Sequence, residues 1–148
     1  MEKRTVAIPP TLRAQLGEVL LHIADEVLDA INNALKEYDI SESKFSLLLL
    51  LYNTGTDQPL QPSEIAAMLG IRRASVTKQL IWLEEHKLIA RTISREDQRM
   101  VNVAITPAGY RLLDRVLPHY WQACANLTGR LTDGETALLL PLLTKINQ

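Results

Sequence analysis

The chain has 148 residues, of which 47% are apolar and 22% charged, and its formal net charge is −1. These values are ordinary for one soluble domain spanning residues 1–148 with a sizeable core. The single cysteine excludes an internal disulfide, and the most apolar stretch, 45–52, is far too short to cross a bilayer. Residues 1–13 lack the apolar run of a signal peptide, so we expect a cytoplasmic protein.

The first predicted element is a long helix over 11–38. Thr11 is a candidate cap, and apolar residues recur behind it at helical spacing. At 1.5 Å per residue such a helix is about 40 Å long, more than a small domain covers, which indicates a partner chain. A polar break follows, and Ser41 or Ser43 is expected to cap a buried helix that carries the apolar run 45–52.

Two shorter helices and a hairpin come next. Pro62 suits the first position of a helix that ends at Gly70, and a second helix is predicted over 73–86. The periodicity then changes to that of strands over 88–94 and 100–106, which predicts a two-stranded hairpin with a highly charged tip.

The C-terminal part predicts two more helices. Thr106 is followed by proline, a strong start for a helix that extends to about Leu127. Thr132 and Glu135 have the spacing of a capping box, and they begin a last helix that ends at Ile146.

The order helix, break, helix, hairpin predicts a winged helix-turn-helix over 41–106, in a mainly α fold with a small β wing. The second helix of such a module enters the major groove of DNA, so it needs an apolar inner face and a polar outer face. Val76, Leu80 and Leu83 supply the inner face. The candidate DNA-binding residues at its N-terminal end are Arg72, Arg73, Ala74, Ser75, Thr77 and Lys78.

The charged hairpin tip is a second candidate contact. Arg95 and Arg99 suit a phosphate or a narrow minor groove, and Asp97 is expected to hold Arg99 or a nearby arginine in place. The alternative is an ordinary polar turn. The segment 71–115 carries nine basic and five acidic residues in an otherwise acidic chain, which indicates a phosphate-facing surface or a solvated face of mixed charge.

An ordered set of motifs resembles the MarR family of winged-helix regulators. The motifs are Pro62-Ser63-Glu64-Ile65-Ala66, Gly70-Ile71, Ser75-Val76-Thr77, Leu83-Glu84-Glu85, Leu88-Ile89-Ala90-Arg91, Asp97-Gln98-Arg99 and Ile105-Thr106-Pro107-Ala108-Gly109. The resemblance implies a homodimer, interlocked through 11–38 and 107–146, that binds near-palindromic double-stranded DNA. It also implies control by small, often aromatic or phenolic, ligands or by oxidants, with ligands bound between the dimer helices and the DNA-binding module.

The sequence departs from that family at several positions. Lys87 stands where a glycine usually ends the second helix, so either Lys87 tolerates the turn or the turn differs. Gln61 and Arg72 stand where short capping residues are usual, and Arg72 is expected to lose a capping bond. Ile81 and Trp82 replace residues that are usually polar, so they either pack against another helix or form an exposed patch.

Ligand and redox candidates lie in the last third of the chain and at the end of the first helix. Tyr38, Tyr120 and Trp121 either line a ligand pocket or belong to the core. Cys124 is either a redox sensor or, because its helix is apolar, a buried inert thiol, and we favour the second.

Catalysis and metal binding find no support in the sequence. A glycine-rich phosphate loop and a nucleophile elbow are both missing, and His22, His86 and His119 are scattered. We therefore expect no enzyme, no catalytic residue, no metal and no cofactor. The remaining alternative is a winged-helix module that binds protein and has lost DNA, and salt-dependent binding to duplex DNA separates the two.

Overall fold

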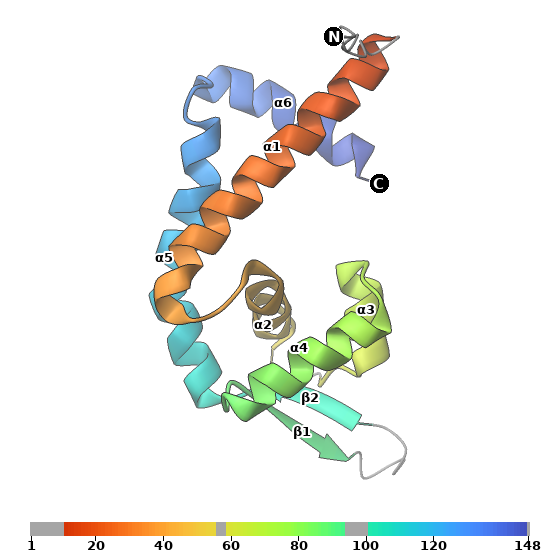
Figure 1. Ribbon diagram of the computed structural model, residues 1–148, viewed down its shortest axis with the longest axis vertical. Helices are drawn as coiled ribbons and strands as arrows, with labels where there is room; N and C mark the ends of the chain where they lie inside the picture. The colour runs from red at the N-terminus through yellow and green to blue at the C-terminus, as the bar shows by residue number, and fades with distance from the viewer. Residues whose placement is uncertain (1–10, 56–58, 94–100, 148) are drawn as a thin grey trace, which may run out of the picture.

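A computed structural model describes residues 11–55, 59–93 and 101–147, and Figure 1 shows their arrangement. The elements in chain order are α1 (Leu12–Leu35), the 3-10 turn η1 (Lys36–Tyr38), α2 (Glu42–Thr54), α3 (Pro62–Leu69), α4 (Arg73–Glu85), β1 (Ile89–Ile93), β2 (Val101–Ile105), α5 (Pro107–Thr128) and α6 (Asp133–Ile146). The predicted mainly α fold with a two-stranded wing is confirmed. Each predicted helix and strand is present within a few residues of its expected bounds.

Three of the predicted helix starts are confirmed by their hydrogen bonds. The Thr11 hydroxyl accepts from the backbone N–H of Ala14 at 3.1 Å, and the Thr106 hydroxyl accepts from Gly109 at 3.1 Å. At α6, the Glu135 carboxylate accepts from the backbone N–H of Thr132 at 2.8 Å, which completes a capping box. The free backbone N–H groups in the first turn of a helix need such acceptors. Residues three positions apart in the sequence were therefore enough to predict where these helices begin.

The expected serine cap of α2 is confirmed in position, but its side-chain capping bond is not formed. Ser41 occupies the cap position without a side-chain capping bond, because its hydroxyl is hydrogen-bonded to that of Ser43 at 3.2 Å. Asn32 of α1 takes the role instead, since its Oδ1 accepts from the backbone N–H of Glu42 at 2.9 Å. The start of α2 is therefore tied to the long first helix.

The core is built around α2, which lies between the other elements of the lower half in Figure 1. Phe45, Leu47 and Leu48 of α2 are fully buried. Side chains from every neighbouring element meet them, namely Leu35 of α1, Ile65 of α3, Val76, Leu80 and Leu83 of α4, Val103 of β2, and Leu113 and Val116 of α5. One core therefore fixes the position of α4 relative to the long helices.

The wing is an antiparallel pair whose register runs from Ile89 opposite Ile105 to Ile93 opposite Val101. A short bridge extends it, because the backbone N–H of Val103 donates to Leu60 at 2.8 Å. The segment ahead of α3 is thereby joined to β2, so the wing and the two-helix unit share one frame.

The turn between α4 and β1 is narrow. Lys87 has φ 59°, the left-handed conformation that glycine normally supplies, so Lys87 tolerates the turn. The Thr106 hydroxyl donates to the Lys87 carbonyl at 2.7 Å, and the Thr106 N–H donates to Leu88 at 3.0 Å. Next to it, a Cβ built on Gly109 would lie 2.3 Å from the Leu88 carbonyl oxygen. The start of α5 is thus pressed against the end of α4.

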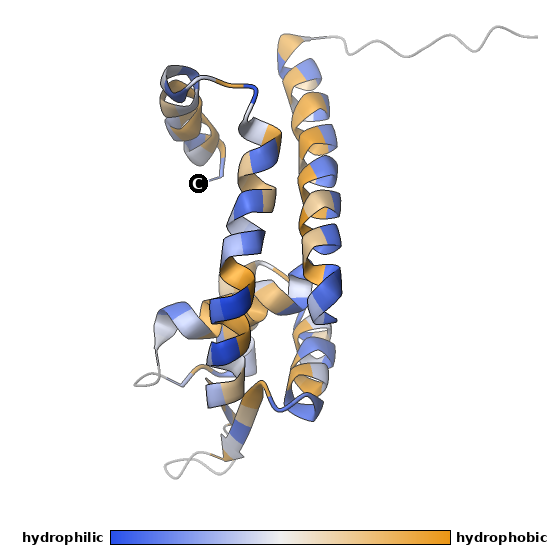
Figure 2. Ribbon diagram, turned by 90° about the vertical axis from the view of Figure 1, so that its left-hand side faces the viewer, coloured by the Kyte–Doolittle hydropathy of each residue, from blue (hydrophilic) through white to orange (hydrophobic). Residues whose placement is uncertain are grey.

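The long helices leave a large apolar surface in water. α1 packs beside α5 at its C-terminal end, while its N-terminal part rises past the core (Figure 1). Figure 2 shows apolar residues along this free part and on α6. The exposed apolar side chains are Leu12, Leu16, Val19, Leu21, Ile23 and Leu28 on α1 and Leu138, Leu139, Leu140, Leu142 and Ile146 on α6.

Candidate nucleic-acid interface

The candidate interface is built on the two-helix unit α3–α4. Pro62 is the first residue of α3, and Gly70 ends it at φ 64°. The backbone N–H of Ile71 then donates to the Ala66 carbonyl at 3.2 Å, which closes the helix end. Gln61 precedes α3, and its N–H donates to the Glu64 carboxylate at 2.7 Å, so the departure at Gln61 leaves α3 capped.

α4 has the two faces that the sequence predicted. Val76, Leu80 and Leu83 are buried against the core. The six candidate DNA-binding residues of this region, Arg72, Arg73, Ala74, Ser75, Thr77 and Lys78, are all exposed. Arg72 occupies the cap position without a side-chain capping bond, as expected. The structure therefore gathers these six residues at the open N-terminal end of one helix.

The candidates at the wing tip, Arg95, Asp97 and Arg99, lie outside the described residues. The flanking strands end with the pair Ile93 and Val101, so the hairpin that carries the tip is present. The roles assigned to the three tip residues stay predictions.

An ion pair joins α4 to the wing. The Arg91 Nε of β1 donates to the Glu84 carboxylate at 2.8 Å. This hydrogen bond lowers the pKa of the Glu84 carboxyl, and it raises the pKa of the Arg91 guanidinium. Arg91 is one of the nine basic residues of the segment 71–115, but the structure engages its charge with Glu84. Seven residues separate the two, so only the fold brings them together.

The two unusual apolar residues of α4 have different surroundings. Trp82 is half-buried between α2 and the end of α4, with Lys44 Nζ 4.2 Å from its ring centroid and the His86 ring stacked at 3.7 Å. Ile81 is 43% exposed, on the outer face with Thr77 and Lys78. Trp82 thus packs against another element, while Ile81 is part of the open surface.

A hollow of about 230 Å³ lies behind α4. It is lined by Glu42, Ser43 and Ser46 of α2, Leu69 and Ile71 around the turn after α3, and Gln79 of α4. The side-chain Oε1 of Gln79 is buried and has no hydrogen-bond partner among the described residues. Because an unpaired buried oxygen costs free energy, a donor group in the hollow would be bound favourably.

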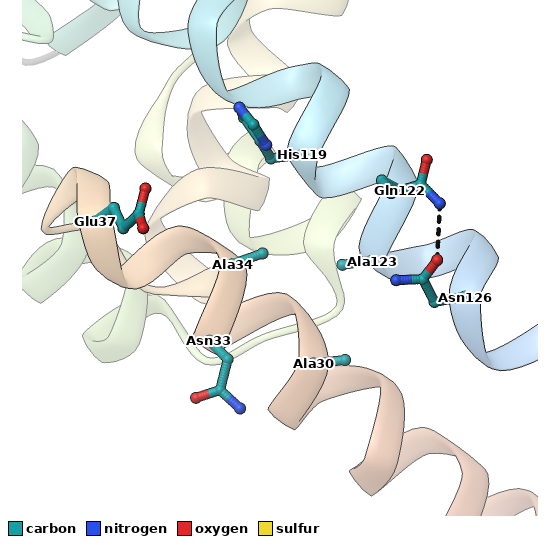
Figure 3. A pocket seen from close by; sticks show the side chains of 8 residues that line it. All are labelled: Ala30, Asn33, Ala34, Glu37, His119, Gln122, Ala123 and Asn126. Carbon is teal, nitrogen blue, oxygen red and sulfur yellow. Dashed lines mark hydrogen bonds between the residues drawn. The ribbon is translucent and has the colours of Figure 1, made fainter.

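Figure 3 shows a second hollow, of about 300 Å³, between α1 and α5. The hollow exists because three of its lining side chains are small, those of Ala30, Ala34 and Ala123. Its rim is polar and consists of Asn33, Glu37, His119, Gln122 and Asn126. Two of these rim side chains are bonded to each other, since Gln122 Nε2 donates to Asn126 Oδ1 at 2.7 Å.

None of the three aromatic residues considered as ligand contacts lines either hollow. Tyr38 and Tyr120 pack against the core, as the alternative interpretation held, while Trp121 is largely exposed. Burial raises the pKa of the neighbouring Cys124 thiol, which favours the inert form over a reactive thiolate.

Neither a metal-binding cluster nor a membrane-spanning helix is found in the described ranges, 11–55, 59–93 and 101–147. No three His, Cys, Asp or Glu residues gather there in a way that would hold a metal ion. No helix in this part of the chain has the length and apolarity to cross a membrane.

Comparison with known proteins agrees with this geometry. A family model described as "MarR family" matches residues 40–101. The HTH-type transcriptional regulator PrsX of Escherichia coli is 31% identical over 123 residues, which cover 83% of this chain and 74% of PrsX. The transcriptional repressor MprA of Escherichia coli is 28% identical over 131 residues, covering 88% of this chain and 74% of MprA. The structure of the S. aureus MepR–DNA complex matches with a TM-score of 0.80 and 25% identity, over 88% of this chain and 94% of that chain.

Proposed function

Because the chain belongs to the MarR family, we propose that it is a transcription regulator that binds double-stranded DNA as a homodimer on a near-palindromic operator. The outer face of α4 carries the proposal, since exposed Arg72, Arg73 and Lys78 flank the short side chains of Ala74 and Ser75. Short residues allow close approach to base edges, and the cations suit phosphates or guanine. The relative MprA is named a repressor. We propose repression here too, by occupation of a site that polymerase needs.

The exposed apolar surface supports the homodimer. Leu138 is 74% exposed and Leu140 63% exposed on α6, and Leu12 and Leu21 are similarly open on α1. A surface of this size in water indicates an interaction partner. A second copy would present the same helices, as a two-fold interface requires, so 11–38 and 107–146 are the proposed dimerisation helices around the winged module 41–106. Two recognition helices would then meet successive major grooves, about 10 base pairs apart.

The cellular setting follows from the proposed target. A regulator of transcription works where the DNA is, so we assign it to the cytoplasm. We assign it no catalytic role, because the matched relatives are named as regulators.

We further propose that the hollow behind α4 takes a small ligand, aromatic or phenolic, that releases the operator. The hollow is lined by Gln79 of α4 and by Glu42 of α2. The backbone N–H of Glu42 donates to Asn32 of α1, so this hollow lies close to the place where the DNA-binding module meets the long helix. A phenol O–H would satisfy Gln79 Oε1. A ligand that binds only one spacing of the two modules shifts the population toward it.

Thermal unfolding with a panel of small phenols and aromatic acids tests the ligand. A binder should raise the midpoint of wild type and not of Gln79→Met, since binding to the native state stabilises it. If no compound raises the midpoint of wild type, or if the shift is equal in both proteins, the hollow is not the site.

The function itself is tested by selecting bound duplexes from a random pool at two salt concentrations. We expect a near-palindrome to be enriched, and the binding constant to fall steeply with salt, because cations on the protein displace counterions from phosphates. No enrichment together with salt-independent binding would favour the protein-interaction module.

Charge-removing variants sharpen this test. Lys78→Ala should reduce the slope of log K against log salt by about two for the dimer, because each subunit gives up one phosphate contact and each phosphate contributes roughly 0.9 to the slope. Arg130→Ala is a matched control, because Arg130 is an exposed cation between α5 and α6, far from α4 in the chain. Equal effects of the two variants would mean that α4 has no special part in binding.

A further inference from the structure

The outer face of α4 is not uniformly polar. Ala74, Thr77, Lys78 and Ile81 occupy positions i, i+3, i+4 and i+7 of the helix, so they share one face, here called the ridge. Ile81 is 43% exposed, although isoleucine is among the residues most often buried. The core already has Val76, Leu80 and Leu83 on the opposite face, so packing within the described chain leaves Ile81 outside.

Thr77 adds to the apolar character of this ridge. Its hydroxyl donates to the Arg73 carbonyl at 3.0 Å, one turn back in the same helix. With that proton engaged by the backbone, the hydroxyl of exposed Thr77 has no free proton to donate to a base. The ridge therefore combines the exposed residues Ala74, Thr77 and Ile81 with the cations Arg73 and Lys78 beside them.

The length of the ridge matches the major groove. Ala74 and Ile81 are seven residues apart, about 10 Å along the helix axis, and the groove is about 12 Å wide. Beyond Ile81 the helix turns acidic with Glu84, paired to Arg91, and exposed Glu85. Carboxylates are repelled by phosphates, so Ile81 marks the last position of α4 that suits contact with DNA.

The major groove offers one apolar group to such a ridge, the C5-methyl of thymine. We propose that Ile81 is a specificity-determining residue that reads thymine methyl groups in each half-site of the operator. This inference rests on the proposed function, and it adds a base preference that neither the family nor the cations of α4 assign. In each half-site, the methyl of at least one thymine packs against Ile81 and leaves water.

The test replaces single thymines of the selected duplex by deoxyuridine, which removes only the C5-methyl. With wild type, replacing the thymine that faces Ile81 in both half-sites should raise Kd about tenfold. Each buried methyl group contributes roughly threefold to fourfold, and each of the two half-sites loses one. Ile81→Ala should bind the thymine duplex about as weakly as wild type binds the deoxyuridine duplex, and it should no longer distinguish the two. Ile81→Val should retain part of the difference.

Met68→Ala is the matched control. Met68 is an apolar side chain of α3, 54% exposed, and its removal should leave the thymine-to-deoxyuridine difference unchanged. Because Ile81 is exposed, Ile81→Ala should keep the circular dichroism and melting midpoint of wild type, so weaker binding would not reflect unfolding.

The outcomes separate the two proposals. If wild type selects a near-palindrome but Ile81→Ala keeps the full deoxyuridine effect, the role of Ile81 is refuted while the regulator stands. If Ile81→Ala weakens binding equally to specific and random duplexes, Ile81 contributes no base reading, and the inference is again wrong. If wild type selects no duplex at all, both the proposed function and the inference are overturned.

Discussion

Lys87 is a residue in a conformation that its side chain disfavours. At φ 59° its Cβ crowds the following carbonyl, which costs roughly 1–2 kcal/mol relative to the right-handed region. The turn is kept because Thr106 bonds both the Lys87 carbonyl and, through its N–H, the Leu88 carbonyl. The neighbouring elements therefore impose the strain on a single residue.

Replacing Lys87 by glycine should relieve this strain. We expect Lys87→Gly to raise the free energy of unfolding by about 1 kcal/mol. Relief of the steric strain stabilises the folded state, and the larger conformational entropy of glycine in the unfolded chain offsets part of this gain. Urea unfolding at one protein concentration measures it. Lys87→Ala is the control, since alanine retains the Cβ. A stabilisation by alanine as large as that by glycine would contradict a strained φ.

Cys124 is expected to react slowly. Burial raises the pKa of its thiol, so less thiolate is present near pH 8. Alkylation of native protein by iodoacetamide should be several-fold slower than alkylation of Cys124→Ser/Ala125→Cys, which moves the thiol to the adjacent exposed position. Equal rates would instead favour a reactive sensor.

The same shift has a pH signature for stability. A thiol whose folded pKa is raised keeps its proton when the unfolded chain has lost it. The contribution of this thiol to the free energy of unfolding is therefore fully present below the pKa of the unfolded chain, about 8.5. This contribution is lost as the pH rises from there through the pKa of the folded protein.

At the scale of elements, the contact between the α4–β1 turn and α5 depends on Gly109. A Cβ there would lie 2.3 Å from the Leu88 carbonyl and 2.6 Å from Ile105 Cγ1, and the first of these is backbone that cannot rotate away. We expect Gly109→Ala to lower the free energy of unfolding by about 3 kcal/mol, the upper range for overpacking. Differential scanning calorimetry would measure it.

Gly134→Ala in α6 is the opposite case. Apart from its chain neighbours and the backbone of α6 itself, no atom of the described residues lies within 4 Å of a Cβ at Gly134, and alanine is the better helix former. This variant should be neutral or more stable by up to about 1 kcal/mol. If both variants behaved alike, the close approach at Gly109 would be refuted.

The elements were largely predictable from sequence because their signals are local. The caps Thr11, Thr106 and Thr132 act within three residues, and apolar spacing marks the inner face of α4. The contacts that were missed join distant residues, as Asn32 with Glu42 and Glu84 with Arg91 do. Separation in the chain hides such pairs until the fold is known.

The candidate site divides in the same way. Exposure of Arg73 and Lys78 follows from helical periodicity. The difference in exposure between Ile81 and Trp82 does not follow from periodicity. It arises because Lys44 of α2 lies over Trp82 while Ile81 stays exposed, and only the tertiary structure shows this. The unpaired Gln79 oxygen likewise depends on how three elements enclose it.

At the scale of the whole molecule, the proposed dimer makes a direct prediction. Leu140→Glu would place a charge on the apolar surface of α6, where Leu140 is 63% exposed in one chain. Because burying an unpaired carboxylate is costly, we expect the dimer dissociation constant to rise at least about 100-fold, measured by analytical ultracentrifugation.

Asn53→Glu is the control for this variant. It adds the same charge at an exposed position in the last turn of α2, outside the proposed dimerisation helices, and should leave association unchanged. A Leu140→Glu chain that sediments as wild type does would show that α6 is not part of the interface.

The junction at Gly109 has a consequence for how operator and ligand would communicate. It clamps the start of α5 to the turn after α4, and the shared core holds α2, α4 and α5 together. The lower α5, the wing and α4 therefore form one stiff body. In the proposed dimer, a rotation of this body against its copy would displace α4 and the wing together, so a small movement near the dimer axis would become a register error on DNA.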